Sequence, residues 1–214
     1  MASKVKEKSS GNTFSTARLE AFSDGVMAFA VTMLALNIKI PRVGDLGTTG
    51  QLGDFLWKQW PAYLLFVISF AIVVMVWANH HNLFRIFDKA DPVLVLLNAA
   101  ILMCVVLIPV SASLLAQYLQ GAESEARLAC LVYGGLFTVG SLFFNLIWWY
   151  GNRAGLASGD FDPALHHSLA RHFRSGPFLY AAATLLCFVS VWISIFLFLL
   201  GIGRYLVTVG IRKS

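Results

Sequence analysis

The sequence predicts an all-α, polytopic membrane protein. Of its 214 residues, 58% are hydrophobic and only 13% are charged, and the mean hydropathy is +0.72. A soluble domain of this length cannot bury so much apolar surface. The apolar residues form long runs that match membrane helices in length, whereas the short alternating segments of an outer-membrane barrel are absent from the sequence. The chain is therefore expected to cross a bilayer several times as helices.

The first predicted helix covers residues 17–40. Its segment 25–36 is apolar apart from Thr32, and Pro41 ends it. Residues 1–16 precede it and are predicted to form a disordered basic tail on the cytosolic side. The helix begins with groups that are costly to leave in hydrocarbon without partners: Arg18, Glu20, Ser23 and Asp24. A helix that faces only lipid has no reason to carry them.

One face of this first helix is apolar. At about 100° per residue, several large side chains point in nearly the same direction, with Thr32 at the margin: Phe22, Phe29, Met33, Leu36 and Ile40. This stripe fits either a plain packing seam or the lining of a narrow apolar pore.

The second and third helices bring further polar groups to the same level of the membrane. The second is predicted at residues 57–87, after a flexible loop at 42–55 that is rich in Gly and Thr. Its end carries a WxxHHxxF pattern whose members share one helix face: Trp77, His80, His81 and Phe84. The third is predicted at residues 92–118, with Asp91 as its N-cap. Asn98 lies about two turns into it, close enough to join these groups.

The second half of the chain contains fewer patterns that point to a specific structure or function. A fourth helix is predicted at residues 126–150, followed by a cytosolic segment, 151–176, with an interfacial helix between Asp162 and Gly176. Three histidines in that helix leave a pH-sensing cluster or a metal site open as alternatives: His166, His167 and His172. The last apolar run, 178–209, is long for one perpendicular span and short for two. A single tilted helix and a pair of short helices both remain open.

Two motifs resemble a known family. The lysosomal potassium channel family called transmembrane protein 175 has an RxxxFSD signature, which four residues of the first helix match: Arg18, Phe22, Ser23 and Asp24. The WxxHHxxF pattern is similar to the second helix of that family, and the chain resembles its single-repeat prokaryotic members. The resemblance implies six transmembrane helices in each subunit, so the last apolar run is divided into helices at 177–190 and 191–209. It also implies a homotetramer in which the first helices line a central pore.

The same resemblance assigns pore-lining residues. By residue-to-residue match, Phe29 takes the principal constriction, Met33 and Leu36 the next apolar layers, and Thr32 a polar ring. The family is understood to select potassium with such apolar rings, which exclude water until the helices move apart. Relatives usually have Ile or Leu where this chain has Phe29, and four phenylalanines would either shut the pore or offer their ring faces to a cation. The competing interpretation is that these residues only pack the helix in a core.

A second group of residues is predicted to anchor the pore helix at its cytosolic end. Buried charges need partners, and removing one partner costs roughly 3–5 kcal/mol. The expected structural network has eight members: Arg18, Phe22, Ser23, Asp24, Trp77, His80, His81 and Asn98. A proton relay through Asp24 and His81 is the functional alternative.

The predicted function is that of a potassium-selective or potassium-preferring cation channel with a hydrophobic constriction. Its expected partners are potassium ions, the lipid bilayer and three further copies of the chain. A proton- or ion-coupled small-solute transporter is the alternative, and a membrane scaffold without transport is a third class. The sequence contains no HExxH, GxSxG, Walker or GxGxxG pattern, so neither an enzyme, a cofactor nor a metal site is expected.

Charge and cysteine content complete the prediction. The net charge of +5 reflects basic residues beside apolar spans, which the positive-inside rule explains better than nucleic-acid binding. The rule places both termini in the cytosol. The expected location is the cell (plasma or inner) membrane. The single cysteines are predicted to be small core residues: Cys104, Cys130 and Cys187.

Overall fold

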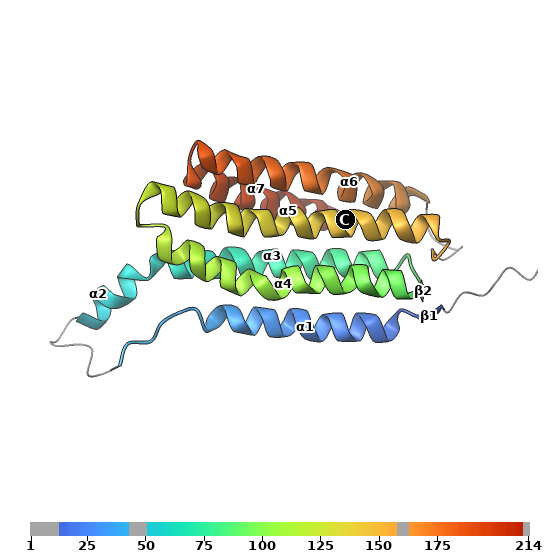
Figure 1. Ribbon diagram of the computed structural model, residues 1–214, viewed down its shortest axis with the longest axis horizontal. Helices are drawn as coiled ribbons and strands as arrows, with labels where there is room; N and C mark the ends of the chain where they lie inside the picture. Colours follow the sequence, from blue (N-terminus) through green and yellow to red (C-terminus); the bar gives the residue numbers. More distant parts are fainter. Residues whose placement is uncertain (1–12, 43–50, 158–162, 212–214) are drawn as a thin grey trace, which may run out of the picture.

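The computed structural model describes residues 13–42, 51–157 and 163–211. Within these residues, helices of 19 residues or more lie side by side along one long axis (Figure 1): α1 (Ala17–Ala35), α3 (Trp60–Phe84), α4 (Pro92–Tyr118), α5 (Glu123–Arg153), α6 (Pro163–Leu185) and α7 (Val191–Ile211). Shorter elements connect them: β1 (Phe14–Ser15), α2 (Gln51–Lys58), β2 (Lys89–Ala90) and a 3-10 turn (Leu186–Phe188). The two strands pair antiparallel at one end of the bundle.

The helices form layers around the pair α3 and α4. Helices α5, α6 and α7 lie on one side of this pair, and α1 lies alone on the other side (Figure 1). Helix α1 packs against α3 and α4 through one face, which has buried residues at helical spacing: Ser23, Met27, Ala30 and Leu34. The opposite face of α1 therefore points away from the subunit.

On the side of the α3 and α4 pair that faces away from α1, the core depends on close contact between α5 and its neighbours. Tyr133 is fully buried on α5, and its hydroxyl is hydrogen bonded to Ser69 of α3 at 2.8 Å. Beside it, a side chain on Gly134 would overlap Thr184 of α6 and Phe198 of α7. The missing side chain thus allows three helices to meet at this point.

Composition and length make this a multi-pass membrane protein. Among the described residues, three helices are long and apolar enough to cross a membrane, namely α3, α4 and α5. A further apolar stretch of α7, Val191–Gly203, is shorter. These helices expose many apolar side chains, as expected where lipid takes the place of water.

The first helix is shorter than predicted. It ends at Ala35 rather than at residue 40, and the next three residues form tighter bonds to the carbonyl three positions back. Polar contacts draw the chain away from the helix axis, because Asn37 donates to the carbonyl of Pro109 and the backbone of Lys39 binds Gln59.

The region before and after α3 also differs from the prediction. The expected loop at 42–55 contains the start of α2, and the expected helix at 57–87 begins only at Trp60 and ends at Phe84. Gln59 interrupts the helical run because its side chain binds the backbone of Lys39. Beyond Phe84 the chain turns so that β2 can pair with β1. The predicted disordered tail, 1–16, was thus wrong for its last residues, while its residues 1–12 lie outside the described part of the chain.

The C-terminal half contains longer helices than predicted. Helix α5 extends the expected 126–150 at both ends, and α6 joins the expected interfacial helix and the expected span at 177–190 into one helix. Pro177 lies inside α6 but is buried, and Phe173, one turn earlier, stacks on Phe144 of α5. We infer that this packing compensates for the free energy lost with the backbone hydrogen bond that proline cannot make. The apolar run that follows is divided at Ser190, directly before α7 begins at Val191.

Candidate functional site

The outward face of α1 carries the predicted pore-lining residues. Phe29 is 59% exposed and Leu36 is 72% exposed, while Met33 is half-buried. Thr32 is exposed and donates its hydroxyl proton to the carbonyl of Phe29 at 2.7 Å, which leaves the lone pairs of its oxygen free. The structure thus places Phe29, Thr32 and Leu36 on the side of α1 that faces away from its own subunit, with Met33 at the edge of that side.

A buried chain of hydrogen bonds fixes the opposite face of α1. Ser23 donates its hydroxyl proton to the carbonyl of Leu19 at 2.8 Å, so its oxygen must accept the bond from the amide nitrogen of Asn98 at 3.0 Å. The amide oxygen of Asn98 then faces Nε2 of His80 at 2.8 Å. Because that oxygen only accepts, His80 donates from Nε2. One directed chain therefore runs from α3 through α4 to α1, and its three side chains are all buried.

A second, exposed pair lies at the same level. The indole nitrogen of Trp77 donates to a carboxylate oxygen of Asp24 at 3.0 Å, and the Trp77 ring stacks on His81 with 6.2 Å between ring centres. Trp77, Asp24 and His81 are all exposed in the single subunit. The bond between Trp77 and Asp24 thus connects α1 to α3 at the surface, in addition to the buried chain of hydrogen bonds.

Two predicted members of the network lie apart from it. Arg18 is exposed and has no hydrogen bond or ion pair among the described residues. Phe22 is 63% exposed and belongs to the outward apolar stripe. Around the helix axis, Arg18 lies within about 20° of Phe29 and Leu36, so its charge shares their face.

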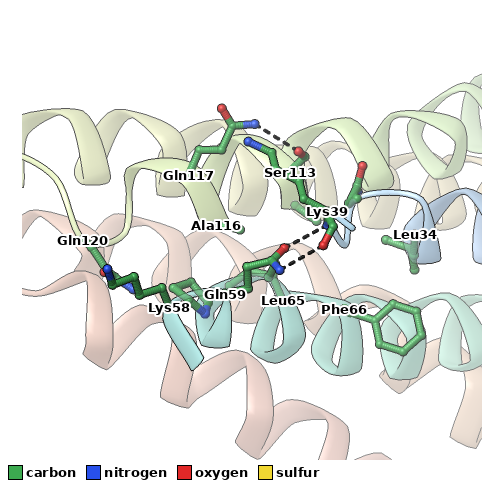
Figure 2. A pocket seen from close by; sticks show the side chains of 14 residues that line it. Leu34, Lys39, Lys58, Gln59, Leu65, Phe66, Ser113, Ala116, Gln117 and Gln120 are labelled. Carbon is green, nitrogen blue, oxygen red and sulfur yellow. Dashed lines mark hydrogen bonds between the residues drawn. The ribbon is translucent and has the colours of Figure 1, made fainter. Parts of the chain in front are cut away.

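A further anchor at the other end of α1 escaped the sequence analysis. The backbone N–H of Lys39 donates to the side-chain oxygen of Gln59, and the Gln59 amide donates back to the Lys39 carbonyl, each at 2.9 Å. Figure 2 shows this reciprocal pair at a cavity of about 270 Å³ between the start of α3 and the end of α4. Asn37 adds a bond to the carbonyl of Pro109 at 2.7 Å. A polar Asn37 at the end of an apolar helix was the signal that could have revealed it.

The histidine-rich part of α6 forms no metal site with the residues described. In that part of the chain, no group of three or more His, Cys, Asp or Glu side chains is placed to hold a metal ion. Nε2 of His166 is hydrogen bonded to the amide oxygen of Asn152 at 2.9 Å, and its ring packs on Trp148. Burial, together with the neighbouring His167, lowers the pKa of His166.

Comparison with known proteins gives the family. The sequence model described as endosomal/lysosomal potassium channel TMEM175 matches residues 18–109, which cover α1 from its second residue, all of α2 and α3, and α4 as far as Pro109. A potassium channel of Chamaesiphon minutus is 38% identical over 84% of this chain and 88% of its own length. This chain belongs to the TMEM175 family. It is therefore an ion channel and not an enzyme.

Other TMEM175 relatives support the same assignment. A potassium channel of Streptomyces collinus is 36% identical over 81% of this chain and 82% of its own length. The crystal structure of a lysosomal potassium-selective channel TMEM175 homolog from Chamaesiphon minutus has a TM-score of 0.78 at 35% identity, covering 90% of this chain and 97% of the other. The endosomal/lysosomal proton channel TMEM175 of Gallus gallus is 31% identical over 54% of this chain and 25% of its own.

Proposed function

We propose that this chain forms a homotetrameric, potassium-preferring cation channel whose pore is lined by α1. The observation that carries the proposal is that α1 packs on its subunit through one face and leaves a mixed face outward, with Arg18 in line with Phe29 and Leu36. An exposed arginine on a membrane helix is costly in lipid, so this face is better suited to an axis that contains protein and water.

The constriction in this proposal is hydrophobic. Four copies of α1 around an axis stack rings of Phe29, Met33 and Leu36, and such rings exclude water and block ions until the helices move outward. The free lone pairs of Thr32 supply acceptor oxygens beside the narrowest ring, where a partly dehydrated cation needs them. The potassium channels among the relatives support K⁺ as the permeant ion.

The proposed topology has six membrane helices with both termini in the cytosol. Three helices meet the criteria of length and apolar character among the described residues, and α1, α6 and α7 are proposed to complete the set. The charged start of α1 and the histidine-rich start of α6 then lie on the cytosolic side of a cell membrane.

The experiment that tests the proposal measures ion flux into liposomes that contain the purified protein. We expect K⁺ flux to exceed Na⁺ flux, and Phe29→Ala to raise K⁺ flux or lower the K⁺/Na⁺ ratio severalfold because it widens the ring. Phe178→Ala is the matched control, because Phe178 is 75% exposed and belongs to α6, a helix on the far side of the bundle from α1 (Figure 1). H⁺ flux is measured in parallel, since some relatives are named proton channels.

Two results would count against this function. Equal changes in Phe29→Ala and Phe178→Ala would remove Phe29 from the constriction. No flux from tetrameric wild-type protein would instead favour the solute transporter or the scaffold.

A further inference from the structure

A second cavity lies in the subunit away from the outward face of α1. It has a volume of about 380 Å³ and lies among α3, α4, α5, α6 and α7. This volume falls in the range of roughly 300–1,000 Å³ that is usual for sites that bind small molecules. Most of its wall is apolar, with contributions from every one of these helices: Ile72, Ile108, Phe137, Leu179 and Phe198.

Polar groups gather at one end of this cavity. Asn79 and Asn82 line it from the end of α3, and Arg171 lines it from the first half of α6. Among the described residues, the two amides make no hydrogen bond and Arg171 makes no ion pair. Amide and guanidinium groups beside an apolar membrane cavity need polar partners, so this end of the cavity calls for an acceptor-rich group.

The dimensions of the cavity match one leaflet of a bilayer. Its lining residues on α3 extend from Ile72 to Asn82, which corresponds to about 15 Å along the helix axis at 1.5 Å per residue. The hydrocarbon core of a bilayer is about 30 Å thick, so the cavity, with its polar end included, spans about half of it. The polar end then lies near the level of the lipid headgroups.

We propose that this cavity binds one acyl chain of an anionic phospholipid from the surrounding bilayer, with the phosphate at Arg171. A guanidinium group pairs with phosphate through two parallel hydrogen bonds, and the amides of Asn79 and Asn82 can donate to the remaining oxygens. Basic pockets between membrane helices are known to hold anionic headgroups. The second acyl chain stays in the bilayer, because the cavity volume suits a single chain.

Glycine keeps the apolar part of the cavity open. A Cβ atom on Gly140 would lie 3.7 Å from the Cβ of Cys104, which is an ordinary contact, so a larger side chain there must extend into the cavity that Gly140 lines. Gly135 lies on the same helix, does not line the cavity and has nothing within 4 Å of its Cβ position. Gly140→Leu and Gly135→Leu therefore form a matched pair.

The test measures lipid binding to detergent-purified, delipidated protein by native mass spectrometry, with phosphatidylglycerol and phosphatidylcholine as the probes. We expect the wild type to prefer phosphatidylglycerol by about fivefold, as one arginine contact provides. Arg171→Gln should abolish this preference, whereas Arg174→Gln, an exposed neighbour outside the cavity lining, should retain it. Gly140→Leu should weaken the binding of both lipids about tenfold, and Gly135→Leu should bind like the wild type.

The outcomes separate the parts of the proposal. Wild-type protein without preference for phosphatidylglycerol, or an unchanged preference in Arg171→Gln, would overturn the headgroup assignment. Wild-type binding by Gly140→Leu would overturn the cavity as the acyl-chain site. Because no ion flux is measured, these results are independent of the proposed channel function.

Discussion

Asn98 connects α1 to α3 through two hydrogen bonds, and Asn98→Leu tests how far the packing of α1 depends on them. The substitution keeps the size of the side chain but removes both of its hydrogen bonds, one to Ser23 of α1 and one to His80 of α3. Ser23 keeps a partner, because its hydroxyl still donates to the carbonyl of Leu19. His80 loses the acceptor for its Nε2–H and is left buried without it.

The magnitude follows from these contacts. A buried polar group that loses its partner costs about 1–3 kcal/mol, whereas hydrogen bonds between membrane helices average only about 0.6 kcal/mol when both partners can find substitutes. The burial of His80 excludes water as a substitute, so we expect a loss near 1–3 kcal/mol. For a chain of this size, each kcal/mol lowers the melting temperature by about 2–4 °C.

The assay is thermal unfolding of the purified protein, followed by gel filtration of samples heated to a series of temperatures. Asn145→Leu is the control, because Asn145 is half-buried on α5 and makes no hydrogen bond among the described residues. Ser23→Ala in the Asn98→Leu background should then cost less than Ser23→Ala alone, since the shared bond is already gone. A melting temperature of Asn98→Leu equal to that of the wild type would refute the anchoring role.

Three further changes test other contacts. Gly151→Ala places a Cβ atom 2.6 Å from the ring of Phe87 and should destabilise the fold by about 1–3 kcal/mol in thermal unfolding. Gln59→Leu removes the acceptor of the Lys39 amide, so hydrogen exchange at that amide should rise about fivefold or more. In the folded protein the pKa of His166 is lowered below the usual 6.5, so the fold disfavours the protonated imidazole. The stability of the fold that His166 contributes above pH 6.5 should therefore be lost as the pH falls through the lowered pKa. His166→Gln should show a smaller fall in melting temperature between pH 7 and pH 5.

Each of these has a clear opposing result. Gly25 has nothing within 4 Å of its Cβ position, so equal effects of Gly25→Ala and Gly151→Ala would show that helix propensity and not the Phe87 contact is measured. Unchanged exchange at Lys39 in Gln59→Leu would mean that another group protects the amide. A pH profile of His166→Gln that matches the wild type would assign the acid sensitivity to other groups.

The sequence predicted the helical membrane class and the family because these depend on local signals. Long apolar runs and the RxxxFSD motif need no knowledge of tertiary contacts. The ends of the helices depended on contacts between distant residues and were predicted poorly. The first helix ends at Ala35 because Asn37 and the backbone of Lys39 bind groups on α4 and at the start of α3, and no pattern within residues 17–40 indicates those partners.

The candidate site shows the same division. The helix positions of Ser23 and Asn98 suggested that they lie at one level. The order of donors and acceptors through His80 depends on how three helices pack, which sequence position does not show. Charge alone suggested that Arg18 and Asp24 would both enter a buried network. Asp24 instead binds Trp77 at the surface of the subunit, and Arg18 lies outward on the apolar stripe. Periodicity distinguishes the faces of a helix but does not show which face meets the subunit.

The two anchors of α1 restrict how a pore lined by this helix can open. The first half of α1 is fixed by the bond between Ser23 and Asn98, and the chain just after α1 by the pair of bonds between Gln59 and Lys39. The residues of the proposed constriction, Phe29 to Leu36, lie between these anchors. If α1 moved outward alone, both sets of bonds would break, at a cost of several kcal/mol. A movement of α1 together with α3 and α4 keeps every bond, so widening of the proposed pore requires these three helices to shift as one unit.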